Sequence, residues 1–167
     1  AGLGISSFRE GCQGDNVLEM EVVTGAGEVV TCSPEKERDL FDAVRSGLGL
    51  CGVITRARLR VVPARPRVRT WYLLYDDLPS LMKDARTLMA DGRFGYLESW
   101  CIPCPQGFRK VEGVPTPFAQ WFFPLHASVE FSPDAPPDER RMLAGLAHYR
   151  QVHREDRSIL EFANRLE

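Results

Sequence analysis

The sequence of 167 residues contains no apolar run that approaches the roughly 20 residues needed to span a bilayer. Its first seven residues contain neither a basic segment nor an apolar stretch, so we do not expect them to act as a signal peptide. The formal net charge is only -2, which provides no overall attraction to nucleic acid or anionic lipid. These absences argue against a membrane-spanning or nucleic-acid-binding protein.

Several catalytic motifs are also missing. The sequence contains no P-loop, no Ser-His-Asp order and no carboxylate pair at a plausible catalytic spacing. Cys101 and Cys104 form a C-x-x-C motif, but the three histidines provide no second pair at zinc-ligand spacing. The motif precedes a proline-containing loop rather than opening a helix, as a thioredoxin-like redox motif does. We therefore interpret it as a chance occurrence, with a metal site or a redox role as the weaker alternatives.

The five cysteines are an odd number, and four lie in apolar strand-like or turn contexts. This pattern argues against a disulfide scaffold and indicates a reducing compartment, so we expect a cytoplasmic protein, with a secreted parent as the alternative. The sequence starts without Met and ends without a helix cap or turn signal. We expect a fragment of a longer protein.

The chain contains two segments, residues 1–62 and 67–167, with a stiff connector at 63–66 because Pro63 and Pro66 disfavour helix. The first segment predicts two strands, a helix and a longer strand. Ser33 is the expected helix N-cap, Pro34 the first helical residue and Gly47 the C-cap. The strands are expected at Leu18–Thr24, Glu28–Cys32 and Val53–Val62.

The second segment predicts strands and helices that alternate along the chain. The expected strands are Val68–Tyr75, Phe94–Ile102, Phe118–Phe131 and Tyr149–Arg154, with helices at Leu78–Ala90 and Pro137–Leu146 and a proline-rich loop at Cys101–Pro117. The first helix should end at Gly92 and turn Leu81, Ala85, Leu88 and Met89 inward. This order predicts an α+β fold with helices on one face of an antiparallel sheet.

A glycine-rich turn follows the first helix. Glycines at 47, 49 and 52 lie directly before the strand that starts at Val53. Because glycine has no Cβ and adopts positive φ, such a turn lets the backbone approach a flat or charged ligand closely. The alternative is that these glycines merely end the helix and turn the chain, with Ile5 and Ile54 in the core.

An ordered series of short motifs resembles one family. The series contains Gly4–Ser7, Phe8–Gly11, Asn16–Gly25, Gly27–Ser33, Asp39–Val44, Gly47–Gly49 and Gly52–Ala57. It is similar to the second half of the FAD-binding domain of vanillyl-alcohol-oxidase (PCMH-type) flavoproteins, and within them to cytokinin dehydrogenases. Residues 67–167 resemble part of that family's substrate domain only in outline.

The resemblance implies an FAD-dependent oxidoreductase that transfers a hydride from a carbon next to nitrogen or oxygen to the flavin. It implies a small amine or alcohol as substrate, with an N6-substituted adenine as the candidate. The implied cofactor residues are Gly4, Ile5, Gly52, Val53, Ile54 and Thr55, and we predict that Gly52→Val removes flavin without unfolding the preceding hairpin. Glu98 is implied at the substrate channel, although an exposed cross-strand partner accounts for it equally well.

The resemblance also implies that the catalytic residues lie outside this chain, so that residues 1–167 alone are inactive. A second hypothesis is a non-enzymatic α+β binding module that has kept the scaffold without the cofactor. Flavin absorbance in the full-length protein distinguishes the two, because only the enzyme retains a coloured cofactor.

Overall fold

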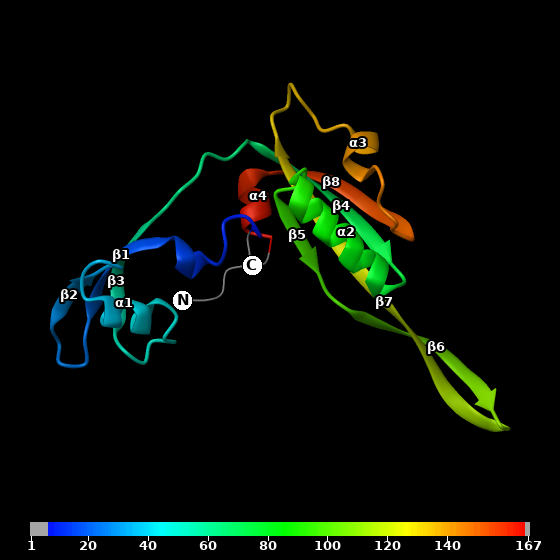
Figure 1. Cartoon of the computed structure of the whole chain (residues 1–167), viewed down its shortest axis with the longest axis horizontal. Coiled ribbons are helices and arrows are strands. Elements are labelled where there is room, and N and C mark those ends of the chain that lie inside the picture. Colours follow the sequence, from blue (N-terminus) through cyan, green and yellow to red (C-terminus); the bar gives the residue numbers. More distant parts are fainter. Residues whose placement is uncertain (1–6, 166–167) are drawn as a thin grey trace. The chain divides into compact units, whose positions relative to one another are not determined.

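The structure of the chain is a computed structural model (Figure 1). It describes residues 7–165, and within them the side chains of all residues except 105–109, 111 and 116–119. The chain divides into two compact units, unit 1 at Ala1–Pro63 and unit 2 at Ala64–Glu167. Among the described residues, no helix is long and apolar enough to cross a membrane.

Unit 1 contains a three-stranded antiparallel sheet and one α-helix. Its elements are the 3-10 helix η1 (Gln13–Asn16), the strands β1 (Val17–Val23), β2 (Val29–Cys32) and β3 (Val53–Leu59), and the helix α1 (Arg38–Arg45). The strand order is β2-β1-β3, so β1 is central. Alternate residues of β1 face the helix, and the resulting core consists of Met20, Val22, Cys32, Phe41 and Val44.

The predicted start of α1 is wrong. Ser33 does not cap the helix: its hydroxyl accepts from the Glu35 and Lys36 amides, at 3.2 and 3.1 Å, and closes a separate turn. The helix begins four residues after Pro34, at Arg38, and its N-cap Glu37 has a positive φ of 52°. Serine favours such local turns as strongly as helix caps, so its presence alone could not distinguish them. At the other end the C-cap is Ser46 rather than Gly47.

Unit 2 contains a five-stranded antiparallel sheet, in which four strands have the order β5-β7-β4-β8 and β6 pairs with the first half of β7. The strands are β4 (Arg67–Tyr75), β5 (Tyr96–Ser99), β6 (Ile102–Val111), β7 (Val114–Phe131) and β8 (Arg150–Ser158). The helices are α2 (Leu78–Asp91), α3 (Glu139–Leu143) and α4 (Ile159–Ala163). The predicted α+β class is therefore confirmed, whereas α4 was not predicted.

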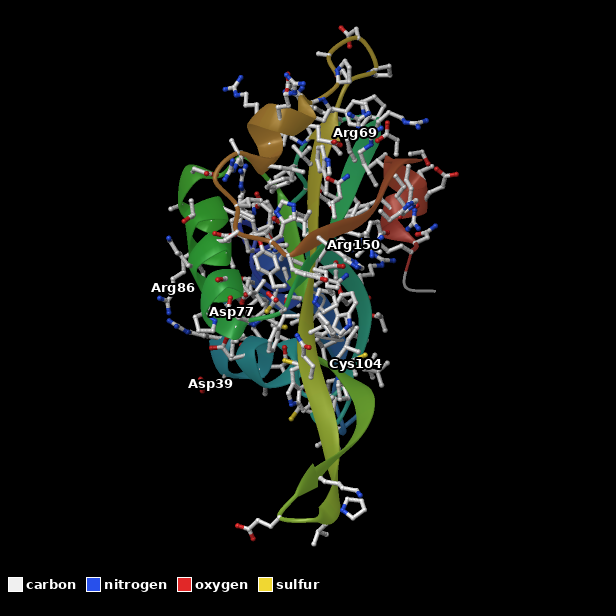
Figure 2. All side chains as sticks on the ribbon, turned by 90° about the vertical axis from the view of Figure 1, so that its right-hand side faces the viewer. Asp39, Arg69, Asp77, Arg86, Cys104 and Arg150 are labelled. Carbon is white, nitrogen blue, oxygen red and sulfur yellow. The ribbon has the colours of Figure 1, made fainter. Side chains whose placement is uncertain are left out.

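Helices α2 and α3 cover one face of this sheet, the helix-covered face. Alternate residues of β4 lie there, and Trp71, Leu73 and Tyr75 are at most 1% exposed. The expected helix α2 is confirmed, from an Asp77 cap that accepts from the Ser80 amide to a left-handed Gly92. Arg86 points away from the sheet (Figure 2). The predicted inward stripe is partly wrong, because Met89 is 52% exposed and Asp84 is buried instead.

The predicted loop at Cys101–Pro117 is wrong, because these residues form most of a long hairpin, β6–β7 (Figures 1 and 2). Its turn has positive φ at Glu112 (49°) and Gly113 (84°), as two-residue hairpins prefer. Pro103 and Pro105 alternate along β6, so their missing N–H groups lie on the same edge of the strand. A two-stranded ribbon tolerates prolines on its outer edges, which explains why proline content misled the prediction.

Further boundaries differ from the predictions, and the strand expected at Val53–Val62 ends at Leu59 in β3. The strand expected at Phe94–Ile102 is limited to β5, and the helix expected at Pro137–Leu146 is the shorter α3. The strand expected at Tyr149–Arg154 continues to Ser158 in β8. Its extension brings α4 beside β4, where the Ile159 amide donates to the carbonyl of Pro66 at 3.0 Å.

Candidate functional site

The predicted cofactor residues belong to unit 1, and their positions are only partly described. Gly4 and Ile5 lie outside the described residues. Gly52, Val53, Ile54 and Thr55 lie at the start of β3, an outer strand of the sheet in unit 1. Four of the six predicted residues therefore lie at one end of an outer strand.

The first two residues of β3 present apolar side chains to the surface. Val53 pairs with Val23 and is 64% exposed, while Ile54 pairs with Val22 and is 36% exposed. Leu48 and Leu50 of the preceding turn are more than 80% exposed. Ile54 is thus not a core residue, contrary to the structural alternative considered for it. Together these side chains form an accessible apolar surface in unit 1, of the kind that contacts a ligand or another surface.

The three glycines of the turn are needed for different reasons. A Cβ on Gly47 would lie 2.1 Å from the Ala43 carbonyl oxygen, and one on Gly52 would lie 2.6 Å from Val22 Cγ1. These two glycines are therefore required by the packing of unit 1 itself. Gly49 has φ of +78°, and its Cβ would meet nothing within 4 Å. Only Gly49 faces open space and leaves room for a close ligand.

Thr55 is committed to the sheet. The β1–β3 register shifts beside it, and its hydroxyl donates to Glu21 Oε1 at 2.7 Å. Arg56 lies next to the same carboxylate, with 3.8 Å between its Nε and Glu21 Oε1. The Thr55 hydroxyl therefore helps to hold the start of β3 against β1, although Thr55 as a whole is exposed, like Ile54.

Glu98, the predicted substrate residue, lies in unit 2 on the face of the sheet opposite α2, which we call the polar face. Cross-strand pairs share a face, so Glu98, Tyr72 and their partner His126 all lie there. The Glu98 side chain is 24% exposed and accepts a charge-assisted hydrogen bond from Arg165, which follows α4. It is therefore a partly buried, ion-paired carboxylate rather than an exposed cross-strand residue.

Aromatic rings surround His126 beside this carboxylate. Its ring centroid lies 4.1 Å from that of Tyr72 and 4.6 Å from that of Trp100, both edge-on. Burial lowers the pKa of His126, so the imidazole is neutral at pH 7. Burial and a hydrogen bond to Glu155 raise the pKa of Tyr72 to about 12, so its phenol stays protonated. The polar face thus combines a carboxylate with a neutral imidazole and aromatic edges.

Sequence reasoning did not identify the contribution of Arg165 or Tyr72 to this group. Arg165 and Glu98 are separated by 67 residues, and only the pairing of β8 with β4 brings α4 to this face. His126 is the cross-strand partner of both Tyr72 and Glu98, which places it on the polar face. The available signal was the alternation along β7, which places every second side chain on the same face.

The cysteine motif shows no sign of a metal site in the part of the chain that the structure describes. Cys101 is exposed and Cys104 is half-buried. Within residues 7–165, no group of three or more His, Cys, Asp or Glu side chains is arranged to hold a metal ion.

Comparison with curated proteins confirms the predicted resemblance. The chain is 47% identical over 102 residues to cytokinin dehydrogenase 7 of Oryza sativa subsp. japonica, which covers 59% of this chain and 20% of that protein. It is 50% identical over 95 residues to cytokinin dehydrogenase 2 of the same plant, covering 57% and 17%. The chain thus spans about a fifth of the length of these relatives. No family model matches the chain.

Two solved structures have a similar fold. A xylooligosaccharide oxidase from Myceliophthora thermophila C1, in complex with xylobiose, superposes with a TM-score of 0.58 over 96% of this chain and 32% of its own. A carbohydrate oxidase from Microdochium nivale, in complex with a substrate analogue, has a TM-score of 0.58 over 96% and 33%. The identities are 17% and 18%, so these likenesses show the fold alone.

Proposed function

We propose that this chain is part of an FAD-dependent oxidoreductase that oxidises an N6-substituted adenine of the cytokinin class. The observation that carries the proposal is the 47–50% identity to cytokinin dehydrogenases. An alignment of 102 residues exceeds the 63 residues of unit 1, so the similarity also extends into unit 2. Both units therefore support the same functional proposal.

The described residues of unit 1 fit one side of a flavin site. A flavin ring requires an accessible apolar contact and a backbone without obstructing side chains. The exposed side chains of Val53 and Ile54 satisfy the first requirement, and Gly49, whose Cβ would meet open space, satisfies the second. We propose that Gly52 and Thr55 support this contact indirectly, by holding the start of β3 against β1.

When bound, FAD would accept the hydride from the substrate carbon next to nitrogen. The residues of this chain would bind and orient the reactants, since the base and other catalytic groups are predicted to lie outside it. In unit 2, the Glu98 carboxylate is an acceptor for a substrate N–H, and the Trp100 ring provides an apolar surface beside it. We propose that the substrate is a small planar amine and that the protein is cytoplasmic.

The test uses the full-length protein, purified by gel filtration and examined by visible absorption. We expect a flavin spectrum that travels with the protein and bleaches when an N6-alkyl adenine is added without oxygen. A coloured protein that bleaches only with an alcohol or sugar would retain the flavin proposal and overturn the adenine one. A colourless, fully folded protein would instead support the non-enzymatic binding module.

A further inference from the structure

The contact between Glu98 and Arg165 has a feature that a simple surface ion pair lacks. Both side chains are partly buried, 24% exposed for Glu98 and 13% for Arg165. Glu98 comes from β5 and Arg165 from the residues after α4, so the pair joins two distant parts of unit 2. Because both charges are partly buried, removing either partner would leave the other unpaired, at a cost in free energy.

Arg165 is held in place by groups other than Glu98. Its Nη1 donates to the Phe162 carbonyl oxygen at 2.7 Å, and its guanidinium carbon lies 3.9 Å from the centroid of the Phe162 ring. Phe162 is 5% exposed and packs on Tyr96, with 4.9 Å between the ring centroids. Phe162 is buried, and both its carbonyl oxygen and its ring hold the guanidinium of Arg165. The guanidinium is therefore oriented by contacts that do not involve Glu98.

The helix that carries Arg165 is itself anchored. The Ser158 hydroxyl accepts from the Glu161 amide at 3.2 Å, while the Glu161 carboxylate accepts from the Ser158 amide at 2.7 Å. This capping box fixes the start of α4 at the end of β8. The position of Arg165 is therefore tied to the sheet through the anchored start of α4.

The other carboxylates of the polar face have different partners. Glu130 accepts from the Tyr96 hydroxyl at 2.5 Å, and Glu155 accepts from the Tyr72 hydroxyl and pairs with Arg157. Neither carboxylate shares the arginine that holds Glu98. One arginine donor is thus dedicated to the carboxylate that faces His126 across the sheet.

We propose that Arg165 is a positioning residue that holds the Glu98 carboxylate in the orientation in which it accepts the exocyclic N6–H of the bound ligand. This inference rests on the proposed function, because it assigns the ligand contact to Glu98. Arg165 does not touch the ligand, and its contribution passes through the carboxylate. Selectivity for ligands with an N6–H over analogues without this donor follows from it, because a fixed acceptor is left unpaired by the analogue.

The test compares two probes on the full-length, flavin-containing protein: adenine, and N6,N6-dimethyladenine, which lacks the N6–H donor. We expect Arg165→Gln to weaken adenine binding by about tenfold in calorimetry, with the dimethyl analogue changed by less than about twofold. Arg165→Lys should recover part of the loss, since it restores the charge but not the planar fork. The flavin spectrum should be unchanged in both variants.

Two further variants separate positioning from general destabilisation. Arg154→Gln removes another arginine–carboxylate contact, the 2.8 Å pair with Glu139 on the helix-covered face, and should affect neither probe. Adding Arg165→Gln to Glu98→Gln should cost no further adenine affinity, because the two residues act through one contact. If Arg165→Gln does not fold, Arg165→Lys carries the comparison, with a smaller loss confined to adenine.

Equal losses for both probes, or no loss for either, would overturn the positioning role while leaving the flavin and the oxidation of N6-alkyl adenines intact. A colourless wild-type protein would instead overturn the proposed function. A flavin-containing wild-type protein that binds neither probe would overturn the assignment of Glu98 and, with it, this inference. The three failures are therefore distinguishable by colour, by wild-type affinity and by the ratio of the two affinities.

Discussion

The two units differ in how far their own residues cover their sheets. In unit 2, Trp71, Leu73 and Tyr75 of β4 are at most 1% exposed beneath α2 and α3, and the opposite face carries a connected set of polar and aromatic groups. In unit 1, every residue of β3 is exposed, including the apolar Val53 and Ile54. Unit 2 thus contains a complete core of its own, whereas the outer strand of unit 1 leaves apolar surface uncovered.

This difference bears on where each unit can bind a ligand. The exposed apolar side chains at the start of β3, next to a glycine turn, suit contact with a large flat group. An ion-paired carboxylate among aromatic rings suits a hydrogen-bonded small molecule. The division agrees with the proposal that unit 1 contacts the cofactor and unit 2 the substrate. The same difference predicts that a core substitution destabilises unit 2 as a whole, whereas a substitution at the start of β3 affects mainly the neighbouring strands of unit 1.

The largest expected effect is in the core of unit 2. Trp71 is fully buried, contacts Phe94 edge-on and donates from Nε1 to Glu139 at 2.9 Å. Trp71→Ala should lower the free energy of unfolding of unit 2 by about 3–5 kcal/mol, because it opens a cavity and removes one of the two side-chain donors, Trp71 and Arg154, that the Glu139 carboxylate accepts from. Urea unfolding followed by circular dichroism measures the loss. A change below about 1 kcal/mol would show that unit 2 is not packed as described.

In unit 1, the corresponding test is Gly52→Val, and the structure changes its expected outcome. Since the added Cβ would lie 2.6 Å from Val22 Cγ1, the variant should destabilise β1 and β3 by about 1–3 kcal/mol instead of leaving the hairpin intact. Hydrogen exchange of the β1 amides measures this. Gly25→Ala is the matched control, because its Cβ meets nothing within 4 Å. Unchanged protection in Gly52→Val would restore the interpretation that this glycine serves the ligand alone.

The regular parts of the fold were predictable because local signals agreed with the packing. The alternation from Val68 to Tyr75, and α2 with its Asp77 cap and Gly92 end, combine a clear period with matching terminal residues. The start of α1 was not predictable, because Ser33 and Pro34 fit a turn as well as a helix. The β6–β7 hairpin was missed because proline's cost depends on which strand edge it faces, which composition does not reveal.

The candidate site was predictable only where its residues adjoin in sequence. The stretch Gly52–Thr55 was predicted as one group, and Val53, Ile54 and Thr55 are exposed at the start of β3. That this stretch contacts a cofactor stays a prediction. The partnership of Glu98 and Arg165 depends on tertiary contacts across 67 residues. No local pattern encodes it, since the pairing of β8 with β4 determines where α4 lies.

A smaller effect is expected at the ion pair that links β4 and β8 on the helix-covered face. Arg69 donates from Nε and Nη2 to the two oxygens of Asp156, at 2.6 and 2.7 Å, and also to the Pro137 carbonyl oxygen at 3.1 Å. The hydrogen bonds from Arg69 lower the pKa of Asp156 below its ordinary 3.8. Asp156→Asn should therefore cost about 1–2 kcal/mol at pH 7.

The pH dependence follows from the direction of that shift. A carboxyl with a depressed folded-state pKa contributes stability that is fully present above its unfolded-state pKa and is lost as the pH falls through the folded-state value. The difference between wild type and Asp156→Asn should therefore be constant near neutrality and shrink progressively below about pH 4. Urea midpoints measured from pH 7 to pH 2 check this. A difference that grows on acidification would contradict the assignment.

The smallest effect is expected at the C-x-x-C motif of unit 2. If a metal bound there and stabilised the unit, its core would no longer depend on its own residues alone, and the comparison with unit 1 would fail. Cys101 is exposed and Cys104 only half-buried, and no metal-binding group of three or more side chains occurs within residues 7–165. Cys101→Ser should shift the stability of unit 2 by no more than about 0.5 kcal/mol, because an exposed thiol contributes little packing. Metal analysis of the wild type should find no stoichiometric zinc. A loss of several kcal/mol that chelators reproduce would instead mean that a bound metal contributes to the stability of unit 2, in addition to the packing of its helices on the sheet.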